Sequence, residues 1–233
     1  MLDQLNRVRA TLGPPISRRA PELVAILAVL LSVVIMGVLA SGLWWFADDW
    51  DFLLTRGLIP SADVGLLAPH GDHWSTGVVV VNRVLLAVFG FENYLPWGLV
   101  PILMHASIMA AMWLLLVRLD VRRWTATAII VFLTFMGAAA EAFLWDATMN
   151  LLGSLLMGVL SLHVVLRTLD LRRLIVLWTA LVVGLSFSGA GIPVLLCVTL
   201  TAWGLHGWRT AMRVASVPLL AFVAWYVEHG RAG

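Results

Sequence analysis

The chain has 233 residues, of which 61% are hydrophobic and only 12% are charged, and its mean hydropathy is +0.97. Soluble domains usually carry about 25% charged residues, so this composition argues against a soluble enzyme domain, a disordered segment and a nucleic-acid-binding domain. A single cysteine excludes a disulfide framework and a cysteine-rich zinc site, which leaves an all-α integral membrane protein with several spans.

The basic residues indicate how the chain would sit in a membrane. All 15 are arginines, and most stand in short clusters between apolar runs. Such clusters are typical of cytoplasmic turns in membrane proteins. The net charge of +2 therefore reflects orientation, and we expect no nucleic-acid partner.

The first apolar run, residues 23–46, predicts a membrane span. It carries no charge and is longer than the stretch of about 20 residues that is needed to cross the hydrocarbon core of a bilayer. It is too long for a signal peptide and ends in aromatic residues at 44–46, without a cleavage site. Later apolar runs occupy residues 94–117, 124–140, 147–166, 174–205 and 211–227.

The run 174–205 is predicted to form two spans. As one helix it would be about 48 Å long, which is too long for a bilayer. Its centre, residues 186–193, reads Ser-Phe-Ser-Gly-Ala-Gly-Ile-Pro, and such a segment breaks helices.

The arginine clusters set the predicted orientation. They comprise Arg7, Arg9, Arg18 and Arg19, then Arg118, Arg122 and Arg123, then Arg167, Arg172 and Arg173, and finally Arg209 and Arg213. If all face the cytoplasm, the chain crosses the membrane seven times, with its N-terminus inside and its C-terminus outside. Residues 76–91 then form an interfacial helix on the outer leaflet. We expect a multi-pass protein of a bacterial inner or plasma membrane.

The first outer loop concentrates the polar chemistry. Five of the 13 acidic residues, Asp48, Asp49, Asp51, Asp63 and Asp72, lie within residues 47–75, together with His70 and His73. Such a loop is suited to general-base work or to binding a divalent cation through oxygen ligands. The alternative is a solvated loop that is acidic without a role.

Three further polar residues lie at or inside the predicted spans. Glu141 stands at an outer span end, where it either faces the bundle interior and marks a site or is simply interfacial. His105 and His163 lie within spans, and each is expected to be a neutral histidine hydrogen-bonded to a neighbouring helix.

The order of these motifs resembles the GT-C superfamily of polytopic membrane glycosyltransferases, in particular the protein O-mannosyltransferase-like and tetratricopeptide-linked branch. The resemblance rests on the Asp48–Asp49 pair, Pro-His-Gly-Asp-His-Trp at 69–74, the amphipathic stretch 82–90, Asn-Tyr-Leu-Pro at 93–96, the span with His105, and the Glu141 segment 139–145. It implies a GT-C-like transmembrane module over residues 23–230, with outer loop 47–93, after a cytoplasmic segment 1–22.

The resemblance also implies a chemistry. Members transfer a sugar from a polyprenyl-phosphate donor on the outer face, with inversion, which assigns Asp49 as general base and Asp48 as its neighbour. Arg83 would bind the donor phosphate, although a snorkelling interfacial role suits it equally. The resemblance further implies that His70, Asp72, His73 and Glu141 bind the substrate. Asp49 and His73 are possible ligands for a divalent cation such as Mg²⁺ or Mn²⁺.

Two alternatives stay open. A transporter needs ionisable residues at mid-membrane, and only His105 and His163 qualify. A non-catalytic assembly subunit, or a truncated module completed by a partner membrane subunit, would carry the same spans without the activity.

Overall fold

The computed structural model describes residues 15–136, 145 and 148–230. Regular secondary structure in these residues is helical, and the one β-bridge there joins His70 to His73. The helical architecture predicted from composition is therefore confirmed for this part of the chain.

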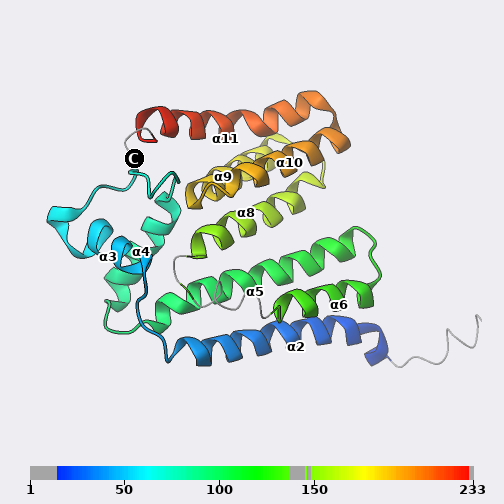
Figure 1. The fold of residues 1–233 in the computed structure, drawn as a ribbon. Helices are drawn as coiled ribbons and strands as arrows, with labels where there is room; N and C mark the ends of the chain where they lie inside the picture. The colour runs from blue at the N-terminus through cyan, green and yellow to red at the C-terminus, as the bar shows by residue number, and fades with distance from the viewer. Residues whose placement is uncertain (1–14, 137–144, 146–147, 231–233) are drawn as a thin grey trace, which may run out of the picture.

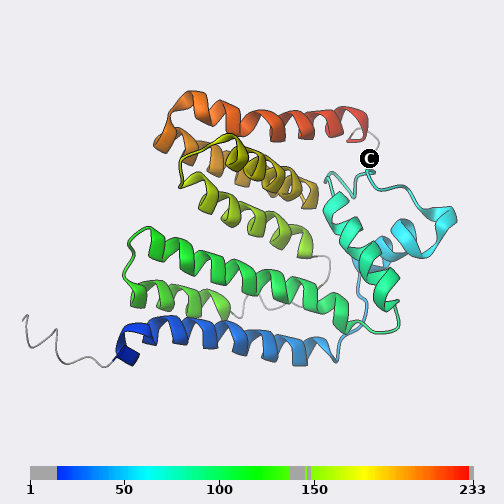
Figure 2. The same cartoon turned by 180° about the vertical axis from the view of Figure 1, so that it is seen from behind.

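Long helices run side by side along most of the molecule (Figure 1; Figure 2 shows them from behind). They are α2 (Pro15–Ala40), α5 (Leu95–Arg118), α6 (Arg123–Thr134), α8 (Met149–Val165), α9 (Leu171–Phe187), α10 (Gly191–His206) and α11 (Trp208–Glu228). Helix α2 packs on α5 and α6, α5 packs on α8, α8 packs on α9 and α10, and both of these pack on α11. Each of these helices lies in or overlaps a predicted apolar run.

Among the described residues, three helices are long and apolar enough to cross a membrane: Arg19–Ala40 within α2, then α5, then α11. Their outer surfaces are apolar as well, since Leu27, Val34 and Val38 of α2 are 64%, 61% and 67% exposed. A soluble helix would place polar side chains at such positions. Helices α6, α8 and α10 are apolar but shorter.

The predicted break in the run 174–205 is present between α9 and α10. Ser188 accepts a hydrogen bond on its hydroxyl from the backbone N–H of Ala190, at 3.0 Å, which is a turn that competes with helix continuation. At Gly191 the first turn of α10 packs directly on α9, because a Cβ there would lie 2.6 Å from the Cα of Leu185. Only glycine permits that approach.

The first loop folds into short helices at one end of the long ones. These are α3 (Asp48–Leu53), the single-turn segments η1 (Leu54–Leu58) and η2 (Pro60–Ala62), and α4 (Thr76–Phe89). Helix α4 lies across the ends of the long helices (Figure 1). It buries Val78, Val79, Asn82 and Leu85 against them and exposes Val80, Val84 and Val88 on its other side.

The two ends of the molecule carry opposite charges. The turns α5–α6, α8–α9 and α10–α11 share one end (Figures 1 and 2), which we call the basic end because their arginines lie at residues 118–123, 167–173 and 209–213. The loop of residues 41–94 lies at the other end, which we call the acidic end. Arg7 and Arg9 lie outside the described residues.

Candidate functional site

Asp49 is held on the inner face of α3. Asp49 is 1% exposed, and one of its carboxylate oxygens, Oδ2, accepts a hydrogen bond from the backbone N–H of Phe46 at 3.1 Å. Phe52, three residues later on the same helix face, is 2% exposed and packs in the cluster around Phe187. The packing of Phe52 therefore aims the Asp49 side of α3 at the ends of the long helices. Asp48 begins α3, and its side chain lies outside what the structure describes.

The segment 69–74 forms a tight turn against α3. His70 and His73 each donate a backbone N–H to the other's carbonyl at 3.1 Å, and Gly71 between them has φ of +54°, a left-handed conformation that favours glycine. Asp72 is exposed at the tip of the turn. His73 is exposed beside the α9–α10 break, since a Cβ on Gly189 would lie 3.0 Å from its Nδ1.

His70 pairs with an acidic residue of α3. Its Nδ1 lies 3.2 Å from Oδ2 of Asp51, and its ring centroid lies 4.3 Å from that of Phe52. Carboxylate and aromatic ring together fix the orientation of the imidazole, and the pair stays partly open to solvent at 25% and 50% side-chain exposure for His70 and Asp51.

Arg56 is the buried centre of the loop. It is 2% exposed, and its guanidinium donates to the carbonyls of Gly65 at 3.2 Å, Ala68 at 2.9 Å and Pro69 at 2.7 Å. Burial lowers the pKa of Arg56, against the opposing effect of nearby Asp51 and Asp63 carboxylates. The side chain stays charged because an arginine pKa lies far above neutrality.

Arg83 ties α4 to the same loop. Its Nη2 lies 2.6 and 2.8 Å from the two carboxylate oxygens of Asp63, and its Nε donates to the carbonyl of Arg56 at 2.9 Å. Asp63 also accepts the backbone N–H of Gly65 at 2.8 Å. The arginine predicted to bind phosphate thus has an acidic partner within the protein.

Aromatic side chains fasten the loop to the long helices. Trp74 stacks on Trp225 of α11, with centroids 5.4 Å apart and planes 8° from parallel, and the indole of Trp225 donates to the carbonyl of Leu67 at 2.8 Å. Phe187 fits between two glycines: a Cβ on Gly77 of α4 or on Gly153 of α8 would lie 2.8 or 2.3 Å from its ring atoms. The acidic end is therefore joined to the long helices by close packing as well as by hydrogen bonds.

The structure brings some of the predicted site residues together. His70 contacts Asp51 and Phe52 of α3, the helix that carries Asp49, and His73 lies beside the α9–α10 break. Glu141 lies outside the described residues, so its placement is not part of this geometry. In the part of the chain that the structure describes, no three histidine, cysteine, aspartate or glutamate side chains gather closely enough to hold a metal ion.

The two histidines of the apolar runs, His105 and His163, contact neighbouring helices, as predicted. His163 Nε2 lies 2.8 Å from the carbonyl of Ala111 on α5, and His105 forms a hydrogen bond with the backbone of Thr134 on α6. Sequence reasoning did not single out Asp51 or Asp63 as partners. Each is one of several loop aspartates, and only the fold shows which of them faces a cation.

In comparisons with known proteins, no family model, no curated protein and no solved structure matches the chain.

Proposed function

We propose that this chain is a GT-C-type membrane glycosyltransferase that takes a sugar from a polyprenyl-phosphate donor on the outer face, with Asp49 as general base. One observation carries the proposal: the carboxylate of Asp49 is buried in a short helix directly after the first candidate span and is oriented by the N–H of Phe46. The hydrogen bond from Phe46 fixes the orientation that this carboxylate would present to an acceptor hydroxyl.

The proposed reaction is an in-line displacement. The acceptor hydroxyl attacks the anomeric carbon and forms the new C–O bond, while Asp49 takes the hydroxyl proton. The bond from the anomeric carbon to the phosphate oxygen breaks, and the lipid phosphate leaves with the electron pair. His70, oriented by Asp51 at 3.2 Å, and His73 and Asp72 from the same turn would position the acceptor.

The proposal includes a seven-span topology with the acidic end outside. The helix positions and the arginines at the basic end support it. Helix α4, whose exposed valines recur at every fourth position, would then lie in the outer interface with this stripe toward lipid.

A membrane-impermeant thiol reagent tests the topology. In a Cys197→Ser background, Ser61→Cys at the acidic end is expected to label from outside in intact cells. Arg122→Cys at the basic end is expected to label only after lysis. Equal labelling of both positions in intact cells would contradict this orientation.

Transfer of radiolabelled sugar from a polyprenyl-phosphate sugar in membranes tests the activity. Asp49→Asn keeps the size and one acceptor oxygen but removes the base, so transfer is expected to fall by about 100-fold or more. Asp120→Asn, at the exposed α5–α6 turn, is the matched control and should transfer normally. Undiminished transfer by Asp49→Asn would refute the assigned base, and loss in His70→Gln alone would move the role to His70.

A second candidate is a non-catalytic membrane subunit. It is favoured by the engagement of the two loop arginines, because Arg56 holds three carbonyls and Arg83 holds Asp63, so a phosphate would have to displace Asp63. This alternative predicts no transfer by the wild-type chain with any donor and co-purification with a partner membrane protein.

A further inference from the structure

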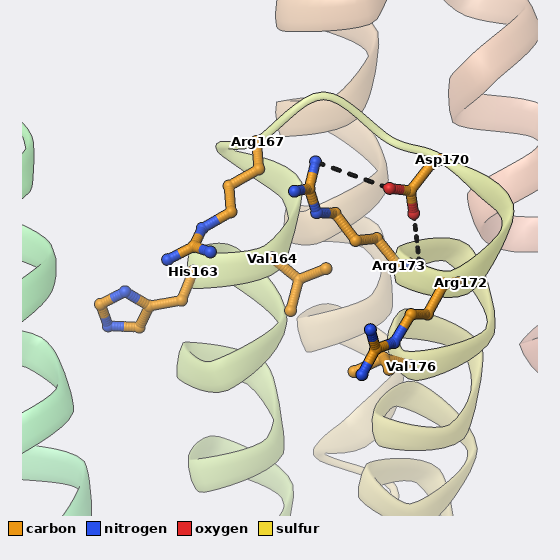
Figure 3. Close-up of a pocket in the computed structure, with 7 residues that line it drawn as sticks. All are labelled: His163, Val164, Arg167, Asp170, Arg172, Arg173 and Val176. Atoms are coloured by element: carbon orange, nitrogen blue, oxygen red, sulfur yellow. Dashed lines mark hydrogen bonds and ion pairs between the residues drawn. The ribbon is translucent and has the colours of Figure 1, made fainter.

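We propose that the α8–α9 turn at the basic end binds the phosphate headgroup of an anionic phospholipid. A cavity of about 400 Å³ opens there, lined by three arginines, Arg167, Arg172 and Arg173, and by His163 (Figure 3). The volume accommodates a phosphate group with part of its substituents. The inference rests on the membrane character of the chain and is independent of the proposed transferase activity.

The cavity has positive charge to spare. Its one carboxylate, Asp170, accepts the backbone N–H of Arg173 at 2.8 Å and lies 3.8 Å from the guanidinium of the same residue. Three arginines against one aspartate leave a surplus of two positive charges. Arg173 also donates to the carbonyl and hydroxyl of Thr168, at 2.6 and 2.9 Å, so it is the arginine that the turn itself uses.

Arg167 and Arg172 supply the surplus. Both are exposed, and neither guanidinium has a hydrogen bond or ion pair with the residues that the structure describes. Figure 3 shows Arg167 at the end of α8 and Arg172 at the start of α9, with no dashed contact to either. Two guanidinium groups from different helices line one cavity, and guanidinium groups make bidentate contacts with phosphate oxygens.

A neighbouring arginine leaves Arg167 available. Arg118 of α5 donates to the carbonyls of His163 and Leu166 at 2.8 and 3.3 Å, so the last turn of α8 already has a basic cap. His163 is likewise fixed by its contact with Ala111. Hydrogen bonds with α5 therefore fix the end of α8 that lines the cavity, and the guanidinium of Arg167 is available to a ligand.

The remaining lining favours a lipid over a free anion. Val164 and Val176 line the cavity on the side away from the turn, three residues before Arg167 and four residues after Arg172. Ile175, beside Val176 in sequence, is 50% exposed, which continues the apolar surface along α9. A charged rim above an apolar wall matches a headgroup with acyl chains below it, and basic pockets of this kind between helices bind anionic lipid headgroups.

The test uses the full chain in lipid nanodiscs with spin-labelled phosphatidylglycerol or spin-labelled phosphatidylcholine. The wild type is expected to bind the anionic probe several-fold more tightly. Arg167→Gln and Arg172→Gln are each expected to weaken that binding about five-fold, as one phosphate-facing charge is lost. Arg213→Gln, an exposed arginine of the same end outside the cavity, is the matched control and should leave binding unchanged.

Three results would overturn the proposal. They are equal affinity for the two lipids, an unchanged preference in the Arg167→Gln/Arg172→Gln double variant, and displacement of the anionic lipid by millimolar inorganic phosphate, which would make this a free-anion site. Because neither guanidinium has a partner among the described residues, the double variant should unfold at the wild-type temperature in the absence of anionic lipid. That measurement separates lost binding from lost folding.

Discussion

Arginine does different work at the two ends of this molecule. At the acidic end, Arg56 and Arg83 are engaged inside the loop, by three carbonyls and by Asp63 respectively. At the basic end, Arg167 and Arg172 face a cavity and have no partner among the described residues. Arg118 and Arg173 of the basic end are engaged by carbonyls as Arg56 is, so the available charge belongs to Arg167 and Arg172.

The reason lies in the backbone around each arginine. Residues 54–75 contain only single-turn helical segments, so many of their carbonyls lack a helical partner and need a donor. The five N–H groups of one guanidinium can serve several carbonyls at once. The α8–α9 turn is short, comprising residues 166–170, and Arg118 and Arg173 already donate hydrogen bonds to its carbonyls.

The largest loss of stability is expected from a substitution at the centre of the acidic end. Arg56→Gln leaves the carbonyls of Gly65, Ala68 and Pro69 without their charged donor, and we expect a loss of about 3 kcal/mol in unfolding free energy. Hydrogen exchange over residues 63–75 should rise in parallel. Arg213→Gln is the control, and an equal loss in both variants would remove the contrast between the ends.

A smaller effect is expected where the acidic end meets the long helices. Gly153→Ala puts a Cβ 2.3 Å from the ring of Phe187, so the ring must move, at an expected cost of about 2 kcal/mol in thermal unfolding. Gly204→Ala in α10 has no atom within 4 Å of the new Cβ and should leave stability unchanged or slightly raised. A tolerated Gly153→Ala would show that Phe187 packing does not anchor the loop.

The Arg83–Asp63 pair should contribute less. It is about one-third exposed on both sides, and Arg83→Gln is expected to cost about 1 kcal/mol, decreasing as salt is added. Asp63→Asn should cost less, because it removes the same ion pair but leaves the bond from Arg83 to the Arg56 carbonyl and keeps an acceptor oxygen for the Gly65 N–H. A loss of transfer in Arg83→Gln without such a loss in Asp63→Asn would instead point to phosphate binding by Arg83.

The smallest effect is expected at the basic end. Arg172→Gln should change the unfolding free energy by less than about 0.5 kcal/mol in the absence of anionic lipid, since its guanidinium has no partner among the described residues. A destabilisation as large as that of Arg83→Gln would mean that Arg172, like Arg118 and Arg173, supports the structure of the basic end.

The helices were predictable because their signals are local. Long uncharged runs predict helices that bury their backbone polar groups internally, and the segment 186–193 predicts the break that separates α9 from α10. The arginine spacing likewise predicts which turns share an end. Placing every arginine cluster on the same side also predicts that residues 76–91 form a helix that does not span the membrane. Helix α4 lies within these residues.

The candidate site depends on contacts that no local pattern encodes. Asp51 lies 19 residues before His70, and Asp63 lies 20 before Arg83, within a loop that has several acidic residues to choose from. Composition and charge order were therefore enough to predict a helical chain that has helices long and apolar enough to span a membrane and charges divided between its ends. Tertiary packing decided which carboxylate is buried, which arginines are engaged and which are available. The reason is that side chains distant in sequence pair only once the helices hold the loop in place.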